Sequence, residues 1–373
     1  MSEDDQNISL NQFDEWLKDD GNVVAVVLRE WFIPVEGRDS IIFPPTYPIE
    51  AKAAGYNIDR FNDGSSVCQI DSVGSQANRM EPVFKREKYK HLVPQVTVRA
   101  GERDINLLDA GHRAADAIVR FSTLGPKLHQ AFQACQNSGN AEPLAKIAPT
   151  SIVFGSWDSR ATQAKKPRIV RSVIRAFNVR ELHRSAQYST IAGEILEEGE
   201  AKVATEGAEA ELGLAHVPAV LAHGGIQVLG EIRRDAALNV EAVRSLADRT
   251  NADSDATLRL RRYILGLALV AFTAPGDSFL REGCHLVPDP ERRATWKLIN
   301  RDGTTGDFAV RPDQAAKFAK EAANTFGVTR DPISGSFDTE TARKVLGLKK
   351  EDRKKLLRQG PVTKEAAERI SKK

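Results

Sequence analysis

Residues 168–179 read RIVRSVIRAFNV, and the structure of this stretch decides how the middle of the chain folds. Its arginines at 168, 171 and 175 fit the three- and four-residue steps of a helix. Arg171, Val173 and Arg175 also alternate as the residues of a strand do, and the Val, Ile and Phe content favours a strand. We therefore predict a strand that presents cations on one face and packs its other face.

The same stretch lies in a block of positive charge. Residues 160–184 hold eight Lys or Arg and one acidic residue, Glu181, whereas residues 189–212 hold seven Glu and one Lys. The net charge of the whole chain is only +2, so charge is segregated along it. Cations on a loop and a strand can neutralise phosphates, and the alternative is an ordinary solvated surface. The candidate phosphate contacts are Arg160, Lys165, Lys166, Arg168, Arg171 and Arg175.

Composition indicates an ordinary globular protein, because 41% of the 373 residues are hydrophobic and 28% are charged. Cys68, Cys135 and Cys284 are far apart and form no CxxC pair, so we predict neither a disulfide framework nor a thiolate zinc site. The longest uncharged stretch, residues 212–230, is broken by proline and paired glycines and does not fit a membrane span. We expect a soluble, cytoplasmic protein.

Strands and helices intermix without strict alternation, which favours an α+β fold, a sheet with helices on one face. Besides residues 168–179, we predict strands at residues 22–33, 92–100, 150–158 and 225–232. We predict helices at residues 9–21, 70–81, 106–121, 124–135, 237–248, 257–273, 313–326 and 339–348. We divide the chain into residues 1–288, with a flexible insertion at 189–215, and a helical extension at 289–373 that ends in a basic tail.

A second group of polar residues lies in residues 71–82, DSVGSQANRMEP. Its members share one face of the predicted helix because they recur at steps of three and four. They are Ser72, Ser75, Gln76 and Arg79. Donors in a row suit contacts with phosphate or ribose, and the alternative is a helix cap beside a solvated face.

Three more arginines are candidates, each with a strong alternative. Arg113 lies in GHRAADAIVR, where a surface pair with Asp116 is the simpler interpretation. Arg233 and Arg234 follow a glycine-rich stretch, residues 224–230. Its glycines allow close backbone approach to a phosphate but also fit a hairpin turn.

Sequence signatures of catalysis, metal binding and nucleotide binding are missing. The seven histidines are scattered without an HExxH pair, and neither GxGxxG nor a P-loop occurs. Ser156, Asp158 and Ser159 cluster, but no GxSxG motif accompanies them. Aromatic residues make up only 6% of the chain, too few for base-stacking strands, which favours sequence-tolerant contacts to phosphate and sugar. We expect no metal, no cofactor and no enzyme activity.

Five longer motifs occur in a fixed order. They are IIFPPTY, QIDSVGSQANRMEP, LLDAGHRAADAIVRFS, PLAKIAPTSIVFGSWDSRATQAKKPRIVRSVIRAF and LRRYILGLALVAFT. Together they closely resemble the Cascade backbone subunit of the type I-G (formerly I-U) CRISPR system, a family within the repeat-associated superfamily of RNA-binding proteins. The resemblance covers residues 41–288.

The resemblance implies a ferredoxin-like, RRM-related palm at residues 1–288, with an antiparallel sheet and inserted fingers and thumb. It also implies that several copies stack head to tail on one guide RNA (crRNA), a heterologous contact that generates a helical filament, together with other CRISPR effector subunits. In such families the palm holds guide phosphates, the thumb displaces bases at intervals, and pairing with the guide reads the target DNA.

Two groups of residues match the family's RNA-contacting motifs. Gln76, Asn78 and Arg79 resemble its polar helix along the guide backbone. The basic loop and strand of the family are matched by Arg160, Lys165, Lys166, Arg168 and Arg171.

A guide-maturing ribonuclease is the alternative function. The superfamily includes nucleases that use a histidine beside a glycine-rich loop, and His223, Gly224 and Gly225 offer this pairing. General acid and base catalysis would require a second group near the histidine. A third class, a protein that contacts DNA within the effector, is distinguished by comparing binding to single-stranded RNA and to duplex DNA.

Overall fold

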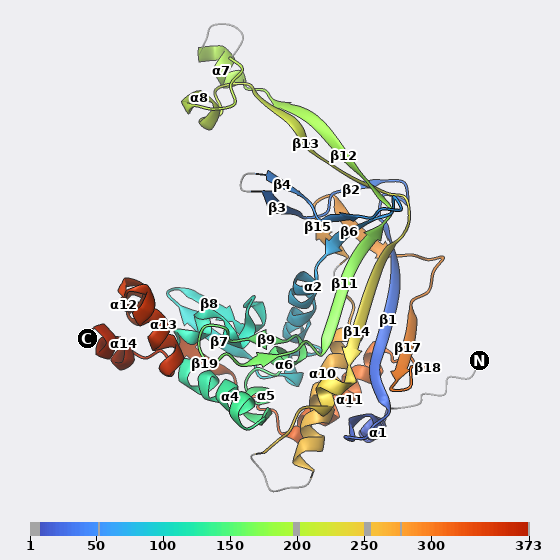
Figure 1. Cartoon of the computed structure of the whole chain (residues 1–373), viewed down its shortest axis with the longest axis vertical. Helices are drawn as coiled ribbons and strands as arrows, with labels where there is room; N and C mark the ends of the chain where they lie inside the picture. Colours follow the sequence, from blue (N-terminus) through green and yellow to red (C-terminus); the bar gives the residue numbers. More distant parts are fainter. Residues whose placement is uncertain (1–7, 51–52, 197–201, 250–254, 277, 372–373) are drawn as a thin grey trace.

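The computed structural model describes residues 8–50, 53–196, 202–249, 255–276 and 278–371 (Figure 1). Among these residues, nine strands form a large sheet in which β15, β16, β1, β14, β11, β6 and β5 follow one another, while β17 pairs with β1 and β18. The strands of this sheet are β1 Val23–Pro34, β5 Ile58–Arg60, β6 Ser66–Asp71, β11 Val170–Phe177, β14 Ile232–Asn239, β15 Phe279–Arg281, β16 Cys284–Pro288, β17 Thr295–Asn300 and β18 Thr305–Asp307.

Four strands at the centre of this sheet follow the order β17, β1, β14, β11, and all neighbours are antiparallel. β1 and β11 therefore run in the same direction, with β14 between them. This split βαβ order is that of a ferredoxin-like sheet. It confirms the predicted α+β fold with an antiparallel palm sheet.

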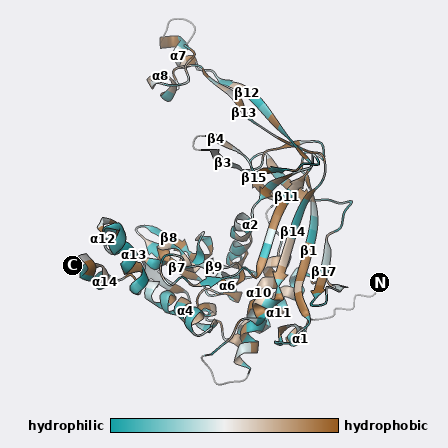
Figure 2. Ribbon diagram, viewed as in Figure 1, coloured by the Kyte–Doolittle hydropathy of each residue, from teal (hydrophilic) through white to brown (hydrophobic). Residues whose placement is uncertain are grey.

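Helices cover one face of the palm sheet. Helix α2 (Val73–Met80) packs on β11, and helix α10 (Ala256–Thr273) packs on β11 and β14. Because side chains alternate between the two faces of a strand, Val170, Ile174 and Ala176 of β11 are buried on the helix-covered face. The hydropathy of the palm strands alternates accordingly (Figure 2). The arginines of β11 belong to the opposite face.

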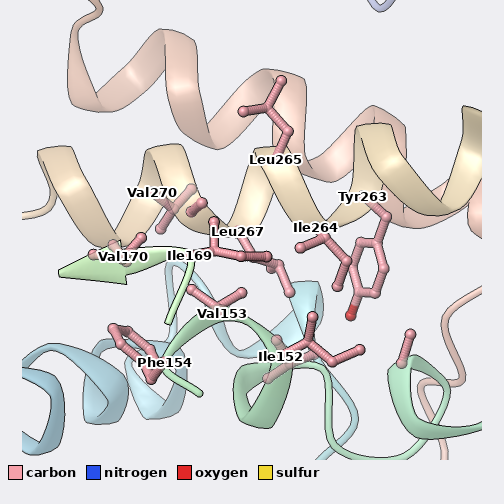
Figure 3. Packing of buried hydrophobic residues seen from close by; sticks show 14 of the residues in the cluster. Ile152, Val153, Phe154, Ile169, Val170, Tyr263, Ile264, Leu265, Leu267 and Val270 are labelled. Carbon is pink, nitrogen blue, oxygen red and sulfur yellow. The ribbon is translucent and has the colours of Figure 1, made fainter. Parts of the chain in front are cut away.

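α10 is buried along most of its length. Figure 3 shows Ile264 and Leu267 directed toward the layer that contains Val170 of β11, whereas Leu265 points to the opposite side of the helix. On that side α10 packs along α11 (Pro312–Phe326). Gly266 permits the close approach of the two helices, because a Cβ atom at this position would lie 2.8 Å from the Cα atom of Ala319.

A side unit occupies the chain between β6 and β11 and lies at the lower left in Figure 1, where the C-terminal helices join it. Its small sheet has the order β19, β7, β8. The elements of this unit are η1 Glu81–Lys85, η2 Lys90–Leu92, β7 Val96–Ala100, β8 Arg103–Asn106, η3 Leu107–Asp109, η4 Arg113–Ala115, α3 Ala117–Arg120, α4 Gly125–Asn137, α5 Glu142–Ala145, α6 Thr150–Val153, β9 Ser156–Trp157, β10 Lys165–Lys166, β19 Ile333–Ser336, α12 Thr339–Gly347, α13 Lys350–Gln359 and α14 Lys364–Ser371.

A long hairpin of β12 (Val179–Tyr188) and β13 (Val217–Val228) extends away from the palm (Figure 1). β12 continues β11, and β13 leads into β14, so the hairpin is continuous with two central strands. The ribbon bends at Asn178, which has a φ of 53°, and at Gly230, where a Cβ atom would lie 2.5 Å from the carbonyl oxygen of Phe177.

The tip of this hairpin contains the insertion predicted at residues 189–215. It carries the short helices α7 (Ile191–Leu196) and α8 (Ala208–Glu211), and residues 197–201 lie outside the described part of the chain. The remaining elements are α1 Asp14–Leu17, β2 Ile41–Ile42, β3 Thr46–Glu50, β4 Ala53–Tyr56 and α9 Val240–Arg244.

Several elements predicted from periodicity are confirmed. The strands at residues 22–33 and 168–179 are β1 and β11. The helices at 124–135, 257–273, 313–326 and 339–348 are α4, α10, α11 and α12. The strand within 92–100 is β7, which starts two residues after Pro94 and lies in the middle of its small sheet.

The helix predicted at residues 106–121 is wrong, because three short helical turns, η3, η4 and α3, replace it. Asn106 caps η3 by accepting a hydrogen bond from the Leu108 amide, and Asp116 caps α3 in the same way through Ile118. Side chains that bind the backbone locally interrupt a helix that apolar spacing alone would continue.

The strand predicted at residues 150–158 is also wrong. Its first half is helix α6, and only β9 is extended. Gly155 separates the two with a φ of 77°, a left-handed conformation that glycine adopts without steric cost.

Four boundaries differ from the prediction. The strand at 225–232 is the end of β13 and the start of β14, and the helix at 237–248 begins only at α9, which Asn239 caps. The helix at 9–21 is reduced to α1. The helix at 70–81 is reduced to α2, because Ile70 belongs to β6.

Residues 289–373 are not helical throughout. Their first part supplies strands β17 and β18 to the large sheet, and α11 then packs along α10. The remainder, α12 to α14, has a small hydrophobic cluster of its own around Val345 and Leu356.

Replacing Gly266 by Ala tests the packing of α10 on α11. The added methyl group would lie 2.8 Å from the Cα atom of Ala319, so α11 must move. We expect the free energy of unfolding to fall by about 1–3 kcal/mol although Ala favours helices. Urea unfolding followed by circular dichroism measures this change. Gly111→Ala is the control, because nothing lies within 4 Å of its added Cβ atom, and equal stability of the two variants would contradict the packing argument.

Candidate nucleic-acid interface

Five of the predicted cations gather on β10, on the loop before it and at the start of β11. We call them the basic cluster: Arg160, Lys165, Lys166, Arg168 and Arg171. Lys166 is half-buried and the other four are exposed. None of the five forms an ion pair within the described part of the chain, so their charges remain available to an anion.

Asp158 organises the loop that carries the first of these cations. The carboxylate is buried and accepts hydrogen bonds from the amide of Thr162 at 2.9 Å and from its hydroxyl at 2.8 Å. It also pairs with Arg120 at 3.1 Å. These contacts of Asp158 fix the loop from β9 to β10 on its buried side. Arg160 lies on the exposed side of the loop. The Ser156, Asp158 and Ser159 cluster thus contains an aspartate with a structural role.

Gly155 brings two arginines together at the base of the basic cluster. Its carbonyl oxygen accepts a hydrogen bond from Nη1 of Arg113 at 3.4 Å. The stem of Arg168 covers the glycine so closely that a Cβ atom at 155 would lie 2.8 Å from its Cγ atom. Two guanidinium groups therefore converge where the chain turns from α6 into β9.

Like charges meet around Arg168. Partial desolvation lowers the pKa of this side chain, and the positive charges of Arg113 and Arg171 lower it further. A guanidinium remains protonated at neutral pH in spite of such a shift. The repulsion is relieved when an anion such as a phosphate binds between the cations.

Trp157 is a surface aromatic residue that the sequence analysis did not select. Its side chain is 58% exposed on β9, and Nζ of Lys165, its partner on β10, lies 5.7 Å from the centre of its rings. The low aromatic content of the whole chain says nothing about a single exposed aromatic residue. The position of Trp157 next to Asp158 in a polar loop could have indicated its exposure, because such a loop offers little apolar surface to bury a tryptophan.

The polar helix predicted at residues 71–82 places its side chains differently from the expectation. Gln76 is buried and donates to Asp71 at 2.6 Å, while it accepts a hydrogen bond from Ser172 at 2.7 Å. Arg79 pairs with Asp71 at 3.2 Å. These two side chains therefore tie α2 to the sheet. Gln76 is buried and is corrected from a candidate RNA contact to a structural group, whereas Arg79 is half-buried and stays a prediction. Asn78 is exposed.

Arg113 is a second correction. Its side chain is 5% exposed and forms an ion pair with the buried Glu81 at 2.6 Å. Burial raises the pKa of Glu81 to about 7, and the Arg113 charge opposes this rise. Nη2 of Arg113 also donates to Asn78 at 3.1 Å. The alternative interpretation, a surface pair with Asp116, is not found among the described residues. The Asp116 carboxylate instead accepts a hydrogen bond from the His112 amide at 3.2 Å.

Arg234 is a third correction, because it points to the helix-covered face of the sheet. It pairs with Glu30 at 3.3 Å and donates to Ser172 at 2.9 Å. Burial lowers its pKa, and Glu30 opposes this effect. Arg234, Glu30 and Gln76 line a cavity of about 490 Å³ that is otherwise bounded largely by apolar side chains.

Arg175 and Arg233 lie directly opposite each other on β11 and β14. Arg233 is neutralised by Glu231 at 2.5 Å and Asp235 at 3.0 Å, and its guanidinium lies 4.4 Å from the centre of the Phe177 ring. Arg175 is half-buried and has no ion-pair partner among the described residues. Only Arg175 therefore extends the charge of the basic cluster across the sheet.

His223 lies on β13 opposite His183 on β12, near the middle of the hairpin. Its ring centre is 5.3 Å from that of Tyr56. Gly224 and Gly225 pack against neighbouring backbone, and the Gly225 amide donates to the Tyr56 hydroxyl at 3.0 Å. The two glycines therefore allow close strand packing, which is the hairpin interpretation of this motif.

The part of the chain that matches a known protein family includes the basic cluster. Residues 26–181 match the model of the family described as CRISPR-associated protein GSU0053. The matched segment runs from β1 to the start of β12 and contains α2 and the whole basic cluster. No curated protein matches the chain. The family match supports a CRISPR-associated protein with a part in CRISPR defence.

None of the helices in the described part of the chain combines the length and the apolar character needed to span a membrane.

Arg113→Ala tests the structural role that the geometry gives this arginine. The substitution leaves Glu81 buried without a countercharge, so we expect the free energy of unfolding to fall by about 3–5 kcal/mol. Arg99→Ala is the matched control, because the Arg99 pair with Asp104 is more than half exposed on both sides and its loss should cost under about 1 kcal/mol. Chemical unfolding measures both. Wild-type stability of the Arg113 variant would overturn the correction.

Proposed function

We propose that the chain is a noncatalytic backbone subunit of a type I-G CRISPR effector complex (Cascade) that binds guide RNA through its phosphates. The observation that carries this proposal is the basic cluster, five cations on neighbouring segments without a carboxylate partner in the described part of the chain. Phosphates satisfy such a cluster whatever the base sequence, and a guide carrier needs that tolerance. The family match supports a CRISPR-associated protein, and the motif resemblance implies the backbone role.

The long hairpin is our candidate for the thumb of this subunit. It emerges between β11 and β14, next to the strand that carries Arg171 and Arg175, and it extends well beyond the palm (Figure 1). The arm leaves the palm at the end of β11 opposite to Arg168 and Arg171, so it would engage an RNA strand beyond the basic cluster. The side unit with β7 and β8 is the corresponding candidate for the fingers.

The remaining parts of the proposal follow from the role of a guide carrier. Further copies bind the same RNA head to tail, other effector subunits complete the complex, and target DNA is contacted through pairing with the guide. Such a subunit acts in the cytoplasm and needs neither cofactor nor metal. We propose no nuclease activity, because the motif at His223 has an adequate structural explanation.

The double variant Arg168→Ala/Arg171→Ala tests the RNA site. We expect binding to single-stranded guide RNA to weaken by about tenfold or more, since two phosphate contacts are lost. The slope of log K against log salt should fall by about 1.4, because each phosphate of a single strand contributes about 0.7. Fluorescence anisotropy over a range of salt concentrations measures both quantities.

Lys317→Ala/Lys320→Ala on α11 is the control for total charge, because both side chains are exposed and lie far along the chain from the basic cluster. This variant should retain the affinity and the salt slope of the wild type. If the two double variants behave alike, the proposed site is wrong. Tighter binding of duplex DNA than of single-stranded RNA by the wild type would instead support a DNA-contacting protein.

Trp157→Ala tests whether the exposed indole adds base stacking to the phosphate contacts. We expect a loss of about 1–3 kcal/mol in RNA binding, because one aromatic platform supports one base. Trp157→Phe should recover most of this affinity, and the salt slope should be unchanged in both variants since no cation is removed. A change in slope without a change in affinity at low salt would contradict a stacking role.

A further inference from the structure

A cavity of about 490 Å³ interrupts the packing on the helix-covered face of the palm sheet. Residues of β1, β11, β14, β16 and β17 line it, together with residues of α2 and of the C-terminal end of α10. Small-molecule sites occupy about 300–1,000 Å³, so the cavity has the size of a ligand site. Arg171 and Arg175 of the proposed RNA site belong to the opposite face of the sheet. The cavity is therefore separate from the RNA site.

The cavity lies between two hydrophobic clusters. On one side, Leu28 and Phe272 of its wall belong to the larger cluster, which contains α10. On the other side, Ile174 and Leu286 belong to the smaller cluster, which contains Cys68 of β6. An apolar molecule in the cavity would contact both clusters and remove their facing surfaces from water.

One part of the wall is polar and rich in hydrogen-bond donors. Glu30 of β1 and Arg234 of β14 lie directly opposite each other there. A guanidinium has five N–H groups. In the described part of the chain, Arg234 donates to Ser172 at 2.9 Å and to Glu30 at 3.3 Å. Its Nη2 has only the sulfur atom of Met80 at 3.8 Å, and sulfur is a weak acceptor, so Arg234 presents donors without a good acceptor.

Positive charge predominates on this wall. Among the described residues that line the cavity, the charged ones are Glu30, Arg79, Arg234 and Arg311. Arg79 pairs with Asp71 and Arg311 pairs with Asp313, but neither aspartate belongs to the wall. We therefore expect the wall to favour an acceptor with a negative charge over a group with a positive charge.

We propose that this cavity binds a small carboxylic acid with an apolar body, such as a medium-chain fatty acid, in its ionised form. A carboxylate offers about four acceptor sites and can pair with a guanidinium through two parallel hydrogen bonds, which suits Arg234. The apolar body lies between the two clusters. An amine would meet like charge at the arginines, and a hydrocarbon would bury their donors without an acceptor.

An anchoring side chain of a protein partner is the other occupant that a largely apolar cavity attracts. No natural side chain combines a long apolar body with a terminal carboxylate. An anchoring residue that fills the apolar part would therefore leave the donors of Arg234 without an acceptor. A small carboxylic acid matches both parts of the wall.

Three ligands that share one body and differ in their head group test the site: decanoate, 1-decanol and decylammonium. Each is titrated below its micelle concentration into the full-length protein without RNA, by isothermal titration calorimetry. We expect saturable binding of decanoate that is about tenfold or more tighter than that of 1-decanol, and decylammonium should bind more weakly than both. A hundredfold excess of decanoate over its dissociation constant should raise the melting temperature by about 3 °C.

Two variants locate the binding. Glu30→Gln/Arg234→Gln removes the guanidinium but keeps a neutral hydrogen-bonding pair, so no buried charge is left alone, and it should bind decanoate and 1-decanol equally. Ala294 lies at the exposed rim of the cavity, and Ala294→Trp should block the entry of all three ligands. Ala186→Trp is the matched control, because it adds the same side chain at an exposed position on β12 and should bind like the wild type.

Three results would each overturn the proposal. They are a wild-type protein that does not bind decanoate, 1-decanol or decylammonium bound as tightly as decanoate, and undiminished decanoate binding by Ala294→Trp, which would place the ligand on another surface. Circular dichroism confirms that each variant is folded. If the Gln variant does not fold, the three ligands and Ala294→Trp still decide the question. Because no RNA is present, the outcome does not depend on the proposed function.

Discussion

The register of β11 is the constraint on which the arrangement of this protein depends. Val170 belongs to the core cluster that α10 and α2 share with the palm, whereas Ile174 and Ala176 pack in a second cluster with Ile70 of β6. Alternation along the strand then places Arg171 and Arg175 on the opposite face. A shift by one residue would bury both arginines and expose the aliphatic side chains, so the hydrophobic core fixes where the positive charge appears.

Arginines with similar sequence surroundings have opposite roles here. Arg113, Arg234 and Arg79 each have a carboxylate partner: the first pair lies within the side unit, the second joins two palm strands, and the third joins α2 to the palm. Arg168 and Arg171 have none within the described residues and face solvent. The two groups meet at Gly155. Its carbonyl oxygen accepts a hydrogen bond from Arg113, and the stem of Arg168 packs on it. Cations held close to one another by a fixed backbone bind an anion without first having to be ordered.

Sequence periodicity predicted the elements that are long and packed on one side. α10, α11, β1 and β11 were all found because each has an apolar stripe of the right period. The segments around Asn106 and Thr150 were not, because local capping and a left-handed glycine decide their structure. At the site, the basic cluster was predicted, but the burial of Arg113, Gln76 and Arg234 was not. Their partners Glu81, Asp71 and Glu30 lie in other elements, and pairing across the fold leaves no local pattern.

The bend between the palm and its hairpin has a geometric consequence. Asn178 has a φ of 53°, and Gly230 packs so closely on the Phe177 carbonyl that a side chain would not fit there. Both residues lie where the hairpin leaves the palm, so this junction influences the direction of the arm. Two residues at the base of a long lever determine where its end lies, so a small change of dihedral angle there would alter the pitch of any helical array built from such subunits.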